Sequence, residues 1–457
     1  MDDRSQLLGN YDVKKLLIKL SVPATIGMMV NALYNFVDTL FVALSEGEAA
    51  IGALTYAFPM QMILMAIGLM IGIGSASVFS RAFGRNDEVV MEQSVNTALR
   101  IDFLLAGTFS VLGFIFLKDI LLFFEATPDN IGFATKYMQI ILIGLVPLSL
   151  SMVLNNLARA EGRAKTAMIA MSLGAGLNIV LDPIFIFGFG LGVQGAAIAT
   201  VTSQIISFIY IFRESLSKRS KLVINLKHIF YINLGNLKDI LVIGFPTFIR
   251  NSVGAFLAMF IIKLLGEYVA DPTLYVSIYG VINRVIFFIF MPGFGLVQGL
   301  SPIIGFNYGA KKFDRLYDVT VYATKMIVLY FFFGFVFVMF FGESVFDLFS
   351  KNNDAFFIEY GTKAFRIISY GFILVGFQIV LGAVYQALGY PVRALLVSLS
   401  RQLFLFVPIV FIMLSLKGLD GLWWTFAISD ITAGLISFLV LVYELKVIKK
   451  RGIKKSE

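Results

Sequence analysis

Four polar residues at helical spacing mark the first long apolar segment of the chain as a place for chemistry. Asn31, Tyr34, Asn35 and Asp38 lie within the apolar stretch Val22 to Leu44. Spacings of three, four and seven residues put all four on one face of an α-helix, because each residue turns the helix by about 100°. A carboxylate near the centre of a bilayer costs about 2.5–3.5 kcal/mol. We therefore expect Asp38 to face a cavity, a partner group or an ion.

A second polar stripe combines an amide and a carboxylate. Gly174, Asn178 and Asp182 follow one another at four-residue intervals in a later apolar segment, and Pro183 comes directly after them. Proline supplies no N–H and clashes with the carbonyl group four residues earlier, that of Ile179. The pattern therefore predicts a polar helix face that ends in a kink or beside a free carbonyl oxygen.

The next apolar segment adds hydroxyl and amide oxygens through Thr200 and Gln204. Two carboxyl groups that share a dry site cannot both stay ionised unless a proton or a cation neutralises them. A hard cation such as Na⁺ takes several oxygen ligands, whereas protonation needs only the acids. If acids of these segments share such a site, the residues leave open whether H⁺ or Na⁺ binds.

Composition requires that these residues sit in a membrane protein. Of the 457 residues, 58% are hydrophobic and 14% are charged, against about 25% charged residues in soluble proteins. With no cysteine and one histidine, His228, in a charged loop, thiol chemistry and a membrane-embedded enzyme have no candidate residues. The net charge of +8 is carried by short loops, a pattern of membrane topology rather than of nucleic-acid binding. We expect no cofactor and no nucleic-acid partner.

Apolar windows predict twelve transmembrane helices, six on each side of a basic linker. The windows lie near residues 16–44, 51–80, 96–117, 133–157, 166–189, 193–213, 238–265, 273–304, 319–342, 362–388, 392–416 and 420–445. Lysine and arginine concentrate at both termini, in the linker and in alternate loops. Those parts are therefore predicted to be cytoplasmic, in a multi-pass protein of the cell membrane.

The two halves of the chain repeat each other. Gly74 to Asp87 aligns with Gly299 to Lys312 at a shift of 225 residues, and the GVQG segment at Gly192 aligns with GLDG at Gly418. Six helices per repeat return the chain to the same side of the membrane, so the repeats are parallel. This predicts an N-terminal lobe (1–215), a cytoplasmic linker (216–236) and a C-terminal lobe (237–457), with a central cleft between the two six-helix bundles.

The acid pair belongs to the first half alone. The repeat mates of Asp38, Asn178 and Asp182 fall near Lys263, Leu405 and Ile409. If the acids only joined helices together, a counterpart would be expected in the second half, where Asp430 is one candidate for a buried acid. Further residues are candidates for the cavity or for substrate contacts: Asn31, Tyr34, Asn35, Asn155, Gln204, Arg284 and Gln378. For Arg284, a structural cation and a cavity role both remain open.

The sequence resembles the multidrug and toxic compound extrusion (MATE) transporters, and in particular their DinF-like branch. The resemblance covers nearly the whole chain. It is carried by LYNFVDTLFVAL (Leu33 to Leu44), SRAFGRND (Ser80 to Asp87), ARAEGRAKTAM (Ala158 to Met168), LNIVLDPIFIFGFGLGVQGAAIAT (Leu177 to Thr200) and YQALGYPVRAL (Tyr385 to Leu395).

The resemblance implies an antiporter that exports amphipathic, cationic compounds in exchange for H⁺ or Na⁺. It also implies that Asp38, Asn178, Asp182 and Thr200 form the cation site of the N-terminal lobe. Other branches place acids on helices 7 and 10, where this chain has Arg250 and Asn251 on helix 7 and Gln378 and Gln386 on helix 10. A lipid or lipid-linked-sugar flippase of the same superfamily is the alternative. We expect a monomer in the lipid bilayer.

Overall fold

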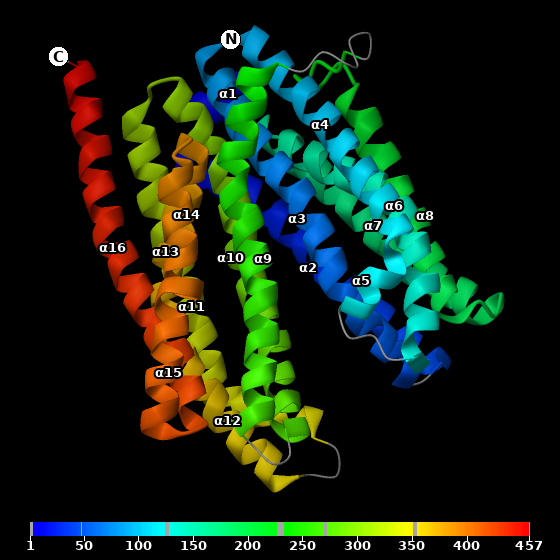
Figure 1. The fold of residues 1–457 in the computed structure, drawn as a ribbon. Helices are drawn as coiled ribbons and strands as arrows, with labels where there is room; N and C mark the ends of the chain where they lie inside the picture. The colour runs from blue at the N-terminus through cyan, green and yellow to red at the C-terminus, as the bar shows by residue number, and fades with distance from the viewer. Residues whose placement is uncertain are drawn as a thin grey trace.

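The computed structural model describes residues 3–46, 48–123, 128–225, 233–268, 272–350 and 354–456. Over these ranges the chain is almost entirely helical and contains no β-strand (Figure 1). His228 and part of the predicted linker 216–236 lie outside the described residues. The limits given above for the two lobes and the linker stay a prediction.

The helices fall into two successive groups. The first group contains α1 (Asp3–Asn10), α2 (Val13–Glu46), α3 (Glu48–Arg85), α4 (Glu88–Ile115), α5 (Leu117–Phe123), α6 (Pro128–Ala160), α7 (Ala164–Pro183), the π-helix η1 (Ile184–Gly188) and α8 (Gly192–Ser215). The second contains α9 (Leu234–Tyr268), α10 (Pro272–Gly309), α11 (Phe313–Phe349), α12 (Ala355–Ser369), α13 (Phe372–Leu388), α14 (Pro391–Leu399), the π-helix η3 (Ser400–Leu405), α15 (Phe406–Lys417) and α16 (Asp420–Ser456).

The prediction of twelve spans in two bundles is confirmed. Within the described ranges, eleven helical segments are long and apolar enough to cross a bilayer, and α12 and α13 together form a twelfth span that bends by 47°. The bend falls at Gly371, where a Cβ atom would lie 2.3 Å from the Cβ of Asp430. The window 362–388 therefore corresponds to a broken helix. The short helices α1 and α5 were not predicted.

Backbone geometry confirms the internal repeat. Asn86 and Lys311 occupy equivalent positions at the shift of 225, and both have the left-handed φ angles of 57° and 56° that non-glycine residues rarely adopt. Gly162 and Gly389, which follow equivalent helices, have φ angles of 85° and 80°. Equivalent loops in the two bundles thus turn in the same way.

The two bundles meet toward one end of the molecule. We call the end where α1 and the C-terminal part of α16 lie the terminal face, and the end where α5 and α12 lie the distal face (Figure 1). The ribbons of the bundles run close together near the terminal face and diverge toward the distal face (Figure 1). The contacts between α3 and α9 and between α2 and α10 join the bundles.

Glycines allow this close approach. A Cβ atom at Gly74 of α3 would lie 2.0 Å from the carbonyl oxygen of Ile240, and one at Gly244 of α9 would lie 1.9 Å from that of Met70. Small residues let the backbones of membrane helices touch. Other glycines approach the opposite group of helices in the same way. We call this set the glycine seam; it comprises Gly74, Gly84, Gly244, Gly295, Gly299, Gly305 and Gly309.

Hydrogen bonds reinforce the glycine seam. Ser21 of α2 donates to the carbonyl oxygen of Leu296 at 3.1 Å, and Ser77 of α3 donates to that of Gln386 at 2.6 Å. Lys312, just after α10, donates to the carbonyl oxygen of Gly9 in the first group at 2.8 Å. The terminal face is therefore closed by contacts between the two groups of helices.

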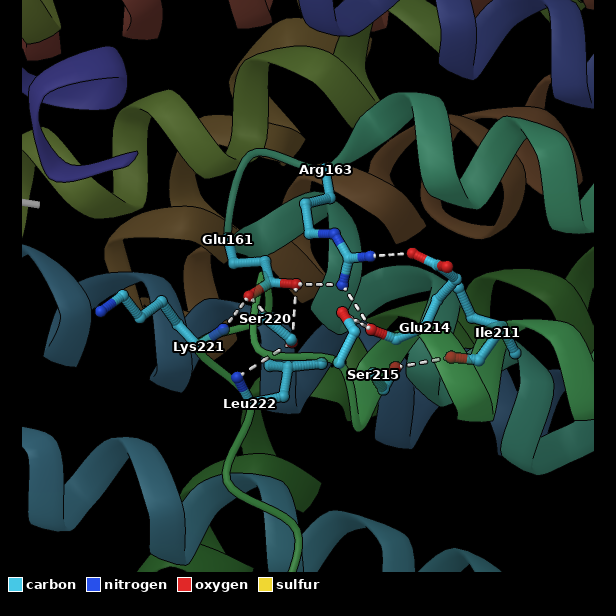
Figure 2. Close-up of polar contacts among 9 residues, drawn as sticks. Glu161, Arg163, Ile211, Glu214, Ser215, Ser220, Lys221 and Leu222 are labelled. Carbon is cyan, nitrogen blue, oxygen red and sulfur yellow. Dashed lines mark hydrogen bonds and ion pairs between the residues drawn. The ribbon is translucent and has the colours of Figure 1, made fainter. Parts of the chain in front are cut away.

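A buried carboxylate holds the segment after α8 against the same face (Figure 2). Glu161, fully buried in the loop between α6 and α7, accepts hydrogen bonds from the Ser220 hydroxyl at 3.0 Å and the Lys221 backbone N–H at 2.6 Å. Arg163 pairs with both Glu161 and Glu214. Burial raises the pKa of Glu161, whereas the Lys221 N–H and Arg163 act in the opposite direction.

Gly244→Ala tests the seam. The added methyl group meets the Met70 carbonyl oxygen, and overpacking of this kind costs about 1–3 kcal/mol. We expect a lower melting temperature for the purified protein in detergent. Gly266→Ala, on the same helix, is the matched control because a Cβ atom there meets nothing within 4 Å. Equal melting temperatures for the two variants would contradict the account of the seam.

Candidate cation site

The four residues expected to bind a cation come together inside the first bundle. Asp38 lies on α2, Asn178 and Asp182 on α7, and Thr200 on α8, three helices that pack against one another. The Asn178 side-chain amide donates to a carboxylate oxygen of Asp182 at 3.0 Å and to the Thr200 hydroxyl oxygen at 3.2 Å. Four-residue spacing along α7 explains why Asn178 and Asp182 meet.

All four side chains are shielded from solvent, with exposed fractions of 8% for Asp38, 1% for Asn178, 0% for Asp182 and 7% for Thr200. Asp38 is close enough to Asp182 for their negative charges to repel. One oxygen each of Asp38, Asp182 and Asn178 is buried and accepts no hydrogen bond within the described part of the chain. Such atoms are rare in proteins, because a buried acceptor without a partner is costly.

The helix that carries two of these residues changes its geometry beside them. Pro183 ends α7, and the chain continues as the π-helix η1. Since Pro183 has no N–H, the Ile179 carbonyl oxygen lacks its usual helical partner. At the position where the sequence predicts a kink or a free carbonyl oxygen, the structure has the wider turn of a π-helix, a feature that often accompanies functional sites.

The donor set fits a proton or a hard cation. Two carboxylates, an amide and a hydroxyl offer oxygen atoms, the ligand type that Na⁺ and similar ions prefer. The described residues contain no group of three or more His, Cys, Asp or Glu side chains able to hold a metal. The three unpartnered oxygens are the observation that makes this cluster a candidate site.

Some of the predicted cavity residues surround the cluster. Asn31 and Tyr34 are half-buried on α2, on the face that also carries Asp38. Asn35 lies in the same helix, but its side chain is outside the described part of the structure. Gln204 lies on α8 against Gly144 of α6.

Other predicted cavity residues make contacts elsewhere. Asn155 donates to Ser151 on its own helix, at 3.3 Å. Gln378 donates to the carbonyl oxygen of Val397 at 2.8 Å and so ties α13 to α14 in the second bundle. Arg284 is exposed on α10. The structure does not bring these three residues into the cluster on α2, α7 and α8.

Sequence reasoning missed two residues beside the cluster. Tyr137 of α6 is 4% exposed and lies close enough to Gln61 of α3 and to Asp38 and Asp182 to interact with all three. A phenol can donate a hydrogen bond to a carboxylate. The sequence feature that could have identified these two residues is that each is a polar residue within a predicted transmembrane span.

A further buried acid was also missed. Asp102 of α4 is fully buried, and one of its oxygens accepts a hydrogen bond from Ser149 of α6 at 2.7 Å. Its other oxygen has no partner in the described residues. The cost argument applied to Asp38 would also have identified Asp102, because it lies in the predicted window 96–117.

The second bundle has a different charge balance. Asp430 of α16 forms an ion pair with Arg401 of η3 at 3.5 Å. Arg250 of α9 interacts electrostatically with Arg401, a like charge. The candidate acid of the second half is thus paired with a cation, whereas Asp38 and Asp182 form no ion pair within the part of the chain that the structure describes.

Two parallel six-helix bundles in a membrane, with the buried pair of Asp38 and Asp182 in the first of them, define a secondary transporter rather than an enzyme. The sequence model of the MatE family matches residues 23–184 and 246–412, so the chain belongs to this family of multidrug and toxic compound extrusion transporters.

Curated relatives agree over almost the full length. The chain is 26% identical over 449 residues to the multidrug export protein MepA of Staphylococcus aureus, covering 97% of each chain. It is 25% identical to the protein of the same name from Staphylococcus haemolyticus, over 94% of each.

Solved structures share the fold. An outward-facing multidrug resistance MATE transporter is 27% identical and superposes with a TM-score of 0.91 over 98% of this chain and 99% of its own. A transporter of the same superfamily from Pyrococcus furiosus, whose binding pocket is described as having reversed polarity, is 28% identical, with a TM-score of 0.91 over 98% of this chain and 99% of its own.

Asp38→Asn and Asp182→Asn should act on stability as one unit. Asparagine keeps the size of aspartate but removes the charge, so either change relieves the same repulsion. The stabilising effect of the double variant should therefore fall short of the sum of the single effects, by about 0.5–3 kcal/mol. Chemical denaturation of the purified variants measures this difference. Strictly additive effects would show that the two carboxyl groups are independent.

Proposed function

We propose that this membrane transporter is an antiporter of the DinF-like branch that exports amphipathic, cationic compounds in exchange for H⁺ or Na⁺. The observation that carries the proposal is the buried cluster of Asp38, Asn178, Asp182 and Thr200 with its unpartnered oxygens. The printed names of the relatives, multidrug export proteins, support the substrate class.

Coupling follows from the charge of the cluster. Without a bound ion, two carboxylates in a dry site repel each other, and a proton or Na⁺ removes that repulsion. Loading therefore changes how tightly α2, α7 and α8 pack. Of these helices, α2 also reaches the second bundle, because its Ser21 and Thr25 contact Leu296 and Gly295 of α10. A change at Asp38 can thus act on the glycine seam through one helix.

In an alternating-access cycle, the glycine seam would close one side of the transporter and open in another conformation. We infer that the terminal face is cytoplasmic, because lysine and arginine concentrate there at both termini. The seam then closes the cytoplasmic side in this conformation, while the bundles diverge on the outer side (Figure 1). Ion entry from outside would load the cluster, and opening of the seam would present the substrate path to the cytoplasm. The transporter acts as a monomer in this scheme.

A flippase that handles anionic lipids or lipid-linked sugars is the second candidate. It is favoured by one observation, the proximity of Arg250 and Arg401 in the second bundle with Asp430 as the ion-pair partner of Arg401. That arrangement leaves excess positive charge, which suits an anionic substrate better than a cationic one.

Gradient-driven efflux tests the antiport. Vesicles that contain the protein are loaded with a fluorescent organic cation, and an inward Na⁺ or H⁺ gradient is imposed. Wild-type protein should respond to at least one gradient, and Asp38→Asn should reduce that response to background with normal expression. Asp347→Asn is the control, because Asp347 is exposed on α11. Wild-type behaviour of Asp38→Asn would refute the role of the cluster, and movement of an anionic lipid alone would favour the flippase.

A further inference from the structure

A pocket of about 270 Å³ opens on the terminal face of the second bundle, in a different bundle from the cation site. Five helices contribute to it: the ends of α10, α13 and α16 and the starts of α11 and α14. Its polar lining residues are Tyr308, Tyr390, Arg393, Glu444 and Arg451. Its apolar lining includes Phe313, Leu388 and Ile448.

The polar groups of the pocket leave one positive charge unmatched. Glu444 is 7% exposed, and its carboxylate accepts hydrogen bonds from Arg393 at 2.6 Å and from the Tyr385 hydroxyl at 3.1 Å. Arg451 instead lies in the same pocket lining as the hydroxyl groups of Tyr308 and Tyr390 and interacts with both. Among the described acids, none forms an ion pair with Arg451.

This set of groups suits a phosphate. A guanidinium group offers several N–H donors in a planar fork that matches phosphate oxygens. The Tyr308 and Tyr390 hydroxyl oxygens lie 3.2 Å apart and can add O–H donors beside Arg451. The helix α14 begins at Pro391 without a side-chain cap, so the positive end of its dipole also lies at the pocket.

The position of the pocket suits a lipid rather than a soluble anion. Arg451 lies in the basic last turns of α16, beyond the apolar window 420–445, where lysine and arginine mark the headgroup side of a membrane helix. Phe313, Leu388 and Ile448 provide an apolar wall beside the charged groups. Basic pockets between membrane helices at the inner leaflet are characteristic sites for anionic headgroups.

We propose that this pocket binds the phosphate headgroup of an anionic phospholipid from the leaflet at the terminal face. Arg451, Tyr308 and Tyr390 hold the phosphate, and an acyl chain lies along Phe313 and Ile448. Arg393 keeps Glu444 neutralised, so that the carboxylate does not repel the phosphate.

The bound lipid would also stabilise the closed seam. Arg81 of α3, in the first bundle, donates to Ser77 and to the carbonyl oxygen of Ala387, next to the turn that carries Tyr390. Its charge interacts with Tyr308 and Tyr390. A lipid that orders the two tyrosines therefore orders the surface against which the end of α3 packs.

Native mass spectrometry of the purified protein tests the proposal. The protein in detergent is mixed with phosphatidylglycerol or with zwitterionic phosphatidylcholine, and the bound lipids are counted. Wild-type protein should retain one phosphatidylglycerol in preference to phosphatidylcholine. Arg451→Gln should weaken that binding about tenfold, the loss of a charge-assisted contact. Lys450→Gln, an exposed neighbour on the same helix, is the matched control and should bind as wild type does.

Tyr308→Phe provides a second variant that removes one hydroxyl group without a change in charge, and it should also weaken binding. Equal retention of phosphatidylglycerol by wild type, Arg451→Gln and Tyr308→Phe would overturn the proposal. Displacement of the lipid by an equal concentration of inorganic phosphate would identify a site for free phosphate and would overturn the lipid assignment.

Discussion

The burial of two carboxyl groups in one membrane bundle is the constraint on which this structure depends. Asp38 and Asp182 are almost fully shielded and repel each other, and each keeps one buried oxygen without a partner among the described residues. Three helices must pack around them, since Asn178 and Thr200 supply the polar contacts that the lipid cannot. A proton or a cation would relieve the remaining cost, and in the function proposed above this makes the packing of the bundle depend on ions.

The backbone repeats, but the chemistry does not. Equivalent turns at Gly162 and Gly389 have the same left-handed geometry. Each bundle also contains a π-helix at an equivalent place, η1 after α7 and η3 after α14 (Figure 1). Yet Asp430 is paired with Arg401, whereas Asp38 and Asp182 of the first bundle form no ion pair among the described residues. In the function proposed above, two similar bundles joined along a glycine seam would rock as units while only the first responds to the ion.

Sequence alone predicted the spans, the repeat and the family, because apolar length, charge placement and glycine spacing are local properties. The convergence of Asp38 with Asn178 and Thr200 followed from helix periodicity and from the resemblance together. Tyr137 and Asp102 were missed, since a single polar residue in an apolar span shows no period. The glycine seam and the bend at Gly371 depend on which helices face each other, and nothing local encodes that choice.

Infrared difference spectroscopy tests the central claim most directly, because it observes the carboxyl groups themselves. Spectra of the reconstituted wild-type protein are recorded as pH is raised, with and without Na⁺, and compared with those of the Asp38→Asn, Asp182→Asn double variant. The account predicts a protonated carboxyl band in the wild type that titrates with pH or shifts with Na⁺ and is absent from the double variant. Identical difference spectra for the two proteins would contradict it.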